Sequence, residues 1–248
     1  MTTKFISDLH LSADRPDITG LFVDFLRHEA RSAEALYILG DLFEYWIGDD
    51  DETPFHRHIK SELKSFTQSG IPCYFIHGNR DFLVGQRFSD ETGVELLPEP
   101  SVIELYGVPT VILHGDTLCT DDTSYQRFRK IIRHPWLLSI ARTFPLALRR
   151  KIATFLRDNS SGNSENSQET KPLTEAELAK YDATPHAVDA LFQDTGTVQM
   201  IHGHTHRPNI HEHPHGIRIV LGDWYDQGSI LDVDASGTTL RSEPLIKD

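Results

Sequence analysis

The sequence predicts an α/β fold of four layers, in which two β-sheets pack face to face, helices cover their outer surfaces, and a helical insertion caps the candidate site. In the first 120 residues, short apolar runs typical of strands alternate with segments of helical periodicity. After His206 the pattern becomes one of strands only. The 248 residues are enough for one such domain with a modest insertion.

Five of the apolar runs end abruptly in residue types that bind metals. Because the carboxyl ends of neighbouring parallel strands meet at one edge of a sheet, we expect these polar residues to lie together. In chain order, the runs and the residues that end them are Phe5-Ile6 with Ser7-Asp8-Leu9-His10, residues 35–39 with Gly40-Asp41, residues 73–76 with His77-Gly78-Asn79-Arg80-Asp81, residues 111–113 with His114-Gly115-Asp116, and residues 198–201 with His202-Gly203-His204-Thr205-His206.

The segments between and after these strands complete the predicted core. Two stretches carry apolar residues at helical spacing, and three later stretches have strand-like composition. The two helical faces consist of Ile18, Leu21, Phe22, Phe25 and Leu26 and of Phe55, Ile59, Leu63 and Phe66, and the late strands are expected at 218–221, 229–233 and 239–243.

Residues 121–195 interrupt the alternation of strands and helices. We therefore expect a core formed by residues 1–120 and 196–248, with 121–195 as a helical insertion over the site. Its helices are expected at 125–155, a stretch rich in Arg and aromatic residues, and at 174–192. Between them, the polar tract 159–170 has the composition of a mobile loop.

Composition narrows the classes of function. A formal net charge of −13 argues against nucleic acid as a partner, although nine Lys or Arg and no Asp or Glu occur between residues 124 and 157. No apolar run reaches the roughly 18 to 20 residues of a membrane-spanning helix, and the first residues lack a secretory signal. Cys73 and Cys119 fit buried thiols in a reducing compartment better than a disulfide. A cytoplasmic protein is therefore expected; a monomer is assumed, since the sequence does not determine the oligomeric state.

Spacing within the polar clusters predicts a site for two metal ions. Asp8 and His10 are two apart in a segment expected to be extended, so both side chains can point toward one ion, and His204 and His206 repeat that spacing. Asp41 is placed to bridge two ions, with Asn79 and His114 completing the second. Each fragment alone is common in unrelated proteins; five of them in this order, each at a strand end, are not. Imidazole and carboxylate ligands suit borderline divalent ions such as Mn, Fe, Zn or Co.

The order of these motifs resembles the calcineurin-like metallophosphoesterase superfamily over most of the chain. The resemblance implies its four-layer sandwich. It also implies that the first ion is held by Asp8, His10, Asp41 and His206, and the second by Asp41, Asn79, His114 and His204. His202 is expected to support these ligands without touching an ion.

Arg80 bears on the kind of phosphate ester that is cleaved. Many phosphatases of the superfamily carry a His directly after the Asn, where this chain has Arg80. Arginine cannot donate a proton near neutral pH, but it binds phosphate oxygens bidentately. A good leaving group is therefore expected, such as the phosphate released from a pyrophosphate bond. We expect Asp41, Asn79, Arg80 and His114 to take part directly in catalysis.

Longer stretches resemble the family of UDP-2,3-diacylglucosamine hydrolases of lipid A biosynthesis nearly end to end. They are residues 42–50, 78–82, 114–122 and 202–208. The resemblance implies a peripheral protein on the cytoplasmic face of the inner membrane, using Mn²⁺ to split the lipid substrate at its α-phosphorus into UMP and 2,3-diacylglucosamine 1-phosphate. It also implies substrate contacts for Asn79, Arg80, Asp122, Ser160, Lys171 and His204. The polar tract departs from the family pattern, and either Asn163 or Asn166 could supply the substrate-binding Asn expected there.

The basic stretch fits a lipid substrate and an anionic membrane surface. Its apolar residues could line an acyl groove while its cations face phosphate headgroups; an ordinary amphipathic helix pair with a solvated basic face is the alternative. A rival enzyme is a metal-dependent phosphodiesterase or nucleotide pyrophosphatase acting on a soluble substrate. A DNA nuclease fits the acidic chain poorly. A metal-free scaffold would be expected to have lost some of the seven ligands, and all are present.

Overall fold

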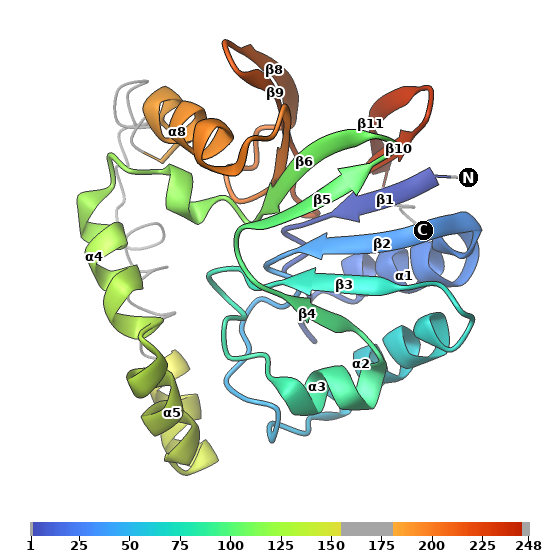
Figure 1. Ribbon diagram of the computed structural model, residues 1–248. Coiled ribbons are helices and arrows are strands. Elements are labelled where there is room, and N and C mark those ends of the chain that lie inside the picture. The colour runs from blue at the N-terminus through green and yellow to red at the C-terminus, as the bar shows by residue number, and fades with distance from the viewer. Residues whose placement is uncertain (1, 155–180, 245–248) are drawn as a thin grey trace, which may run out of the picture.

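Two β-sheets form the centre of the computed structural model, which describes residues 2–154 and 181–244 (Figure 1). The first sheet has the order β11-β10-β1-β2-β3-β4, and the second has the order β5-β6-β7-β9-β8. The first consists of β1 (Thr2–Ile6), β2 (Ala33–Leu39), β3 (Cys73–Ile76), β4 (Glu95–Leu97), β10 (Gln227–Asp234) and β11 (Gly237–Pro244). The second consists of β5 (Ser101–Leu105), β6 (Val108–Leu113), β7 (Gln199–His202), β8 (Asn209–His213) and β9 (Gly216–Val220).

Helices cover the outer face of each sheet, which confirms the predicted four layers. Helices α1 (Pro16–Asp24), α2 (Pro54–Thr67) and α3 (Gln86–Thr92) lie on the first sheet, and α8 (Pro185–Thr195) lies on the second (Figure 1). A π-helical turn, Phe25–Glu29, extends α1. Between the sheets, apolar residues such as Phe5, Ile112 and Ile201 are fully buried in one cluster. Two further apolar clusters lie between each sheet and its helices, and burial of the three clusters is the main stabilising term of the fold.

The parallel strands align the loops that follow them. Strand β1 pairs in parallel with β2, β2 with β3, β6 with β7, and β7 with β9. Their carboxyl ends therefore face the same edge, as the sequence predicts. The three late strands are confirmed as β9, β10 and β11; β4, β5, β8 and α3 were not predicted.

The described part of the insertion differs from the predicted pair of helices. Residues 125–154 form α4 (Thr123–Ile132), α5 (Pro135–Thr143) and a further helical segment at 146–154. The breaks fall before Pro135 and at Pro145, because proline disfavours helical backbone in the preceding residue. The next described helix, α8, begins at Pro185 rather than at 174, and residues 181–184 are not helical. Residues 155–180, which include the polar tract, lie outside the described residues.

Both cysteines are buried and free, as predicted. In the part of the chain that the structure describes, no helix combines the length and apolar character required to cross a membrane.

Candidate metal centre

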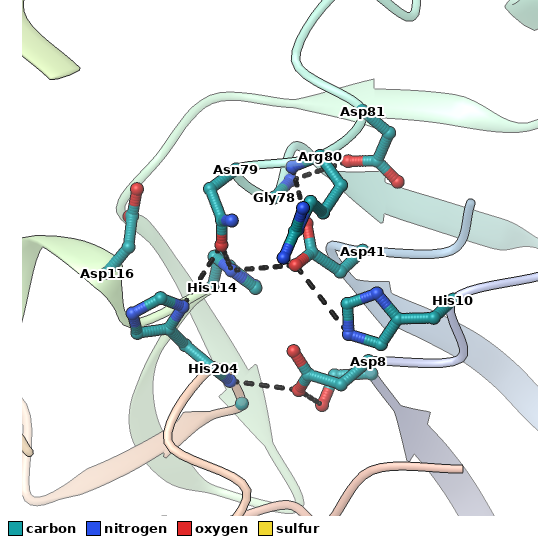
Figure 2. A network of polar contacts seen from close by, with 12 residues as sticks. Asp8, His10, Asp41, Gly78, Asn79, Arg80, Asp81, His114, Asp116 and His204 are labelled. Carbon is teal, nitrogen blue, oxygen red and sulfur yellow. Dashed lines mark hydrogen bonds and ion pairs between the residues drawn. The ribbon is translucent and has the colours of Figure 1, made fainter. Parts of the chain in front are cut away.

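Loops after β1, β2, β3, β6 and β7 bring the predicted ligands together at one edge of the two sheets (Figure 2). One group consists of Asp8, His10 and His206, and another of Asp8, Asp41 and His114; within each group one potential ligand atom per residue lies within 4.8 Å of the others. The seven predicted ligands thus come from five separate segments, as the sequence predicts.

Asp8 offers one carboxylate oxygen to a cation. Its Oδ2 accepts hydrogen bonds from the Ser7 hydroxyl (2.6 Å) and the His204 amide (2.9 Å). Its Oδ1 is buried without a hydrogen-bond partner, 3.4 Å from His206 Nε2. His10 Nε2 is also buried without a hydrogen-bond partner. Buried polar atoms are normally satisfied, so two such atoms without a partner in one cluster fit a site that binds a cation.

A second set of donor atoms converges on Asn79. Its Oδ1 lies 2.9 Å from His114 Nε2 and 3.1 Å from His204 Nδ1 (Figure 2). These three atoms are the donors expected of the second ion's ligands. The two groups share Asp8, and Asp41 belongs to only one of them, so the division of ligands between two ions stays a prediction.

Asp41 lies between His10 and His114. Its Oδ1 accepts a hydrogen bond from the amide of Arg80 (2.8 Å). Its Oδ2 lies 3.9 Å from His10 Nε2 and 3.8 Å from His114 Nε2. A carboxylate oxygen nearly equidistant from one imidazole of each group is the arrangement required of a bridging ligand.

In three histidines, Nδ1 lies next to a carbonyl or carboxylate oxygen, and this contact leaves Nε2 facing the predicted metal site. His114 Nδ1 donates to the carbonyl oxygen of Leu39 (2.9 Å). His10 Nδ1 lies 3.2 Å from Glu44 Oε2, and His206 Nδ1 lies 3.3 Å from Asp223 Oδ2. Such partners fix the orientation of metal-binding histidines and increase their basicity. The sequence analysis missed Glu44 and Asp223, although Gly222-Asp223 repeats the strand-end pattern after β9.

The backbone of the ligand loops contradicts the predicted extended geometry. Positive φ angles occur at Asp8 (55°), His10 (50°), Asp41 (51°), His204 (68°) and His206 (54°). This left-handed conformation costs an L-residue roughly 1–2 kcal/mol. The side chains still converge, but they do so through tight, strained loops rather than through alternation along a strand. Strained backbone of this kind is concentrated at functional sites.

Two glycines allow the loops to approach each other. A Cβ on Gly78 would lie 2.1 Å from Asp41 Oδ1, and a Cβ on Gly203 would lie 2.2 Å from Asp8 Oδ2. Asp81 supports the same approach: its Oδ1 accepts from the Gly78 amide (2.9 Å) and its Oδ2 from the Leu42 amide (2.8 Å). Burial, with the charge of Asp41, raises the pKa of Asp81 to about 6.

Electrostatics show how strongly the cluster favours cations. Burial lowers the pKa of His114, but the charges of Asp41 and Asp8 outweigh burial and raise it to about 9. Burial also lowers the pKa of His206, but the neighbouring carboxylates of Asp223 and Asp8 outweigh burial and raise it to about 10. For His204, burial dominates and lowers the pKa to about 3. A divalent cation would take the place of the protons that the carboxylates hold on His114 and His206.

Helix α4 of the insertion contacts two ligand loops through arginines. Arg133 Nη2 donates to the carbonyl oxygen of Gly78 (2.7 Å). Arg129 donates to Asp116 Oδ2 (2.7 Å) and Glu99 Oε2 (2.8 Å). Glu99 in turn accepts, through Oε1, the amide hydrogen of His114 (2.9 Å). The insertion is therefore hydrogen-bonded to the loop of Asn79 and, through one carboxylate, to that of His114.

A second contact lies at residues 146–154. Arg149 is buried and donates to the Ile47 carbonyl oxygen (2.5 Å) and to Asp50, and Arg150 pairs with Asp51 (2.5 Å). The expectation that the basic stretch faces phosphate headgroups is therefore wrong for Arg129, Arg133 and Arg149, because these side chains are largely buried and are held by carboxylates and carbonyl groups of the core. Arg127, Lys130 and Lys151 are exposed.

The predicted substrate contacts are only partly described. Asp122 accepts a hydrogen bond from the Tyr125 amide (2.9 Å) and so caps α4. The Arg80 side chain is 39% exposed, with Nη1 4.0 Å from Glu44 Oε1. Ser160 and Lys171, like Asn163 and Asn166, lie outside the described residues. His202 is fully buried below the ligand loop, with Nδ1 2.8 Å from the Gly203 carbonyl oxygen.

The chain is similar to known proteins over nearly its whole length. Residues 1–208 match the family described as calcineurin-like phosphoesterase. The chain is 50% identical over 246 residues to the UDP-2,3-diacylglucosamine hydrolase of Photobacterium profundum, covering 98% of this chain and 97% of the relative. It is 51% identical over 240 residues to the hydrolase of the same name from Actinobacillus succinogenes (96% and 98%). It is 50% identical over 252 residues to that of Vibrio vulnificus (100% of both chains).

A solved structure agrees at the level of the fold. An archaeal phosphodiesterase covers 99% of this chain and 100% of its own, with a TM-score of 0.50 and 13% identity. At this identity the similarity concerns the arrangement of sheets and helices alone.

Proposed function

Since the chain belongs to the calcineurin-like phosphoesterase family, we propose that it is a metal-dependent hydrolase that cleaves the pyrophosphate bond of UDP-2,3-diacylglucosamine. The products are UMP and 2,3-diacylglucosamine 1-phosphate, an intermediate of lipid A biosynthesis. The proposal takes its substrate from relatives about half identical over the whole chain.

The observation that carries the reaction class is the position of Asp41 Oδ2, 3.9 Å from His10 Nε2 and 3.8 Å from His114 Nε2. The orphaned Asp8 Oδ1 and His10 Nε2 face the same space. Oxygen and imidazole donors without a thiolate fit Mn²⁺, which we propose as the ion. Two such ions would activate the attacking water and neutralise charge on the phosphoryl oxygens.

Residues of the β3 loop are placed to orient the substrate. Arg80 stays charged, is partly exposed, and follows Asn79 directly. Its guanidinium can bind two phosphate oxygens at once but cannot protonate a leaving group. A pyrophosphate needs no such proton, because its leaving group is a phosphate. We propose attack of water on the α-phosphorus: the bond to the bridging oxygen breaks, and 2,3-diacylglucosamine 1-phosphate leaves.

The described part of the insertion supports a lipid substrate at a membrane surface. It exposes a group of large apolar side chains, far more than a soluble enzyme with a small polar substrate requires. The group consists of Phe128 (45% exposed), Ile131 (60%), Trp136 (65%), Phe144 (40%), Leu148 (43%) and Ile152 (42%). With the exposed cations Arg127, Lys130 and Lys151, this surface suits peripheral binding to the cytoplasmic face of the inner membrane.

Product analysis tests the proposal. The Mn²⁺-loaded protein is incubated in detergent with UDP-2,3-diacylglucosamine in ¹⁸O-labelled water, and the products are identified by mass spectrometry. We expect UMP carrying the label together with unlabelled lipid 1-phosphate, and no products after chelation. The matched control is UDP-N-acetylglucosamine, which has the same pyrophosphate but no acyl chains.

Two outcomes would contradict the proposal at different levels. Equal cleavage of both sugar nucleotides would favour the alternative, a pyrophosphatase or phosphodiesterase acting on soluble substrates. If ¹⁸O appeared in the lipid 1-phosphate, the proposed substrate would be correct, but water would attack the β-phosphorus instead of the α-phosphorus.

A further inference from the structure

A cavity of about 250 Å³ lies beside the loop that carries His204 and His206, and no predicted metal ligand lines it. Strands β8 and β9, the ligand loop and the segment before α8 form its walls. The lining residues are Asp182, Thr205, Arg207, Pro208, Asn209, His211 and Val220. Its size is below that of most pockets for drug-sized ligands and suits a small polar one.

Arg218, which is not itself among the lining residues, is a buried charge without a hydrogen-bond partner next to two of them. On β9 it is directly opposite His211 of β8 and two residues before Val220, and both of these line the cavity. The residue is 7% exposed, and its Nε and Nη1 are buried with no partner. An unpaired buried cation is costly, because nothing replaces the water it has lost.

Among the residues that the structure describes, Asp182 is the only carboxylate that lines the cavity, and its charge acts on Arg218 without a hydrogen bond between them. Asp182 accepts the Ala183 amide hydrogen at Oδ1 (2.7 Å) and pairs with Arg207 through Oδ2 (2.8 Å). Cys119, which also interacts with Arg218, is an uncharged thiol, since burial raises its pKa to about 12. Burial and the charge of Arg218 lower the pKa of His211, which favours the neutral imidazole, and a neutral imidazole cannot compensate the charge of Arg218. Two guanidinium groups thus share one carboxylate.

A neutral donor lies in the same wall. Thr205 Oγ1 is buried and has no hydrogen-bond partner. It comes from the ligand loop, whereas Arg218 comes from the sheet, so the two unsatisfied groups are independent observations. Both are donors, and both can be satisfied by one acceptor with several oxygens.

We infer that this cavity is a second binding site, separate from the metal centre, for a phosphate group held by Arg218 with Arg207 and Thr205. Phosphate matches the excess positive charge, and its oxygens accept several N–H and O–H donors at once. Inorganic phosphate and the phosphate of a nucleoside monophosphate share this chemistry. The inference does not depend on the proposed function.

Thermal unfolding of the chelator-treated protein tests the site, because chelation removes phosphate binding at the metal centre. With sodium phosphate added at constant ionic strength, we expect the Tm of the wild type to rise. Arg218→Met should abolish the rise and weaken phosphate binding by about tenfold or more, as expected for a lost charged hydrogen bond. In phosphate-free buffer its Tm should be no lower than that of the wild type, because the substitution removes an uncompensated charge.

Matched variants make the test specific. Arg27→Met removes an exposed arginine of α1's extension and should keep the full phosphate response. Arg207→Met, at a side chain that is 46% exposed, should weaken the response without unfolding the protein. An equal rise in Tm with UMP and with phosphate would show that the phosphate group alone is recognised. A larger rise in Tm with UMP that is lost in Arg218→Met would identify the nucleotide as the ligand. No rise in the wild type, or an undiminished rise in Arg218→Met, would overturn the inference.

Discussion

Arg133, the C-cap residue of helix α4, donates a hydrogen bond to the carbonyl oxygen of Gly78, at 2.7 Å, and Gly78 precedes Asn79 in the chain. The insertion is thus joined to the backbone of a ligand loop. Arg133 also pairs with Glu99 (3.2 Å) and Asp116 (3.3 Å).

Arg133→Met should lower kcat/KM by roughly 10- to 100-fold, because a charged hydrogen bond contributes about 1.5–3 kcal/mol. Since Arg133 acts through the position of Asn79, kcat should fall more than KM rises. Steady-state kinetics at saturating Mn²⁺ measure this split. Arg127→Met is the control, as it removes an exposed cation from the same helix. An equal loss of kcat/KM in Arg133→Met and Arg127→Met would show that Arg133 acts only through its charge and not through its hydrogen bond to Gly78.

His10→Ala should abolish turnover and leave the fold intact, because Nε2 of His10 has no other hydrogen-bond partner. A loss well above the roughly 100-fold typical of residues behind a metal ligand is expected. Metal content by atomic absorption and far-UV circular dichroism accompany the activity measurement. The exposed His28 provides the control, His28→Ala. Turnover unchanged in His10→Ala would contradict the two-metal assignment.

Asp223→Asn should weaken Mn²⁺ binding by about 10- to 100-fold, since the carboxylate lies 3.3 Å from His206 Nδ1 and orients that ring. Excess Mn²⁺ should restore most of the activity. Titration of activity against free Mn²⁺ gives the apparent affinity, and Asp226→Asn in the same loop is the comparison. A defect that excess metal does not restore would place Asp223 in catalysis instead.

Gly78→Ala should destabilise the protein and inactivate it, because the added Cβ would lie 2.1 Å from Asp41 Oδ1 and 2.3 Å from the Asp41 amide nitrogen. Gly20→Ala, within α1 and with nothing within 4 Å of the added atom, should stabilise it by about 0.5–1 kcal/mol. Urea unfolding measures both. Similar free energies of unfolding for the two variants would show that the ligand loops can separate without cost.

The difference in stability between the wild type and His56→Phe should depend on pH. Burial of His56, on α2 against Phe43 and Trp46, lowers its pKa below 6.5. The unfolded chain therefore binds this proton more readily, so the wild type loses stability relative to the variant as pH falls through 6.5 toward the folded-state pKa. Urea titrations at pH 7.5 and 5.5 measure the effect. A difference that stays constant between these pH values would contradict it.

The sequence predicts the strand-end residues well, because apolar runs and metal-type residues leave local signals. Asp8, Asp41 and His114 lie where that pattern places them. The left-handed backbone at the ligands leaves no such signal, since Asp and His are compatible with extended strands too. The sequence predicts that the side chains of Asp8 and His10 converge, and the structure shows that a left-handed backbone at both residues brings them together.

The partners of the ligands could not be predicted in the same way. Glu99 and Arg129 are 30 residues apart and meet only through tertiary packing. The basic stretch shows the same limit. Composition alone cannot distinguish a cation exposed to a membrane from one paired with a buried carboxylate, such as Arg129 with Asp116.

The attachment of the described insertion has a consequence for ionic strength. Helix α4 buries none of its residues, so charged contacts, rather than an apolar interface, hold it to the core. Salt screens exposed charges over about 10 Å at 0.1 M and affects buried pairs much less. The Arg150 side chain is 54% exposed, whereas those of Arg129 and Asp116 are 17% and 0% exposed. Rising salt should therefore loosen the Arg150–Asp51 contact before the Arg129–Asp116 contact, while the buried Arg149 still attaches the segment 146–154 to the carbonyl oxygen of Ile47.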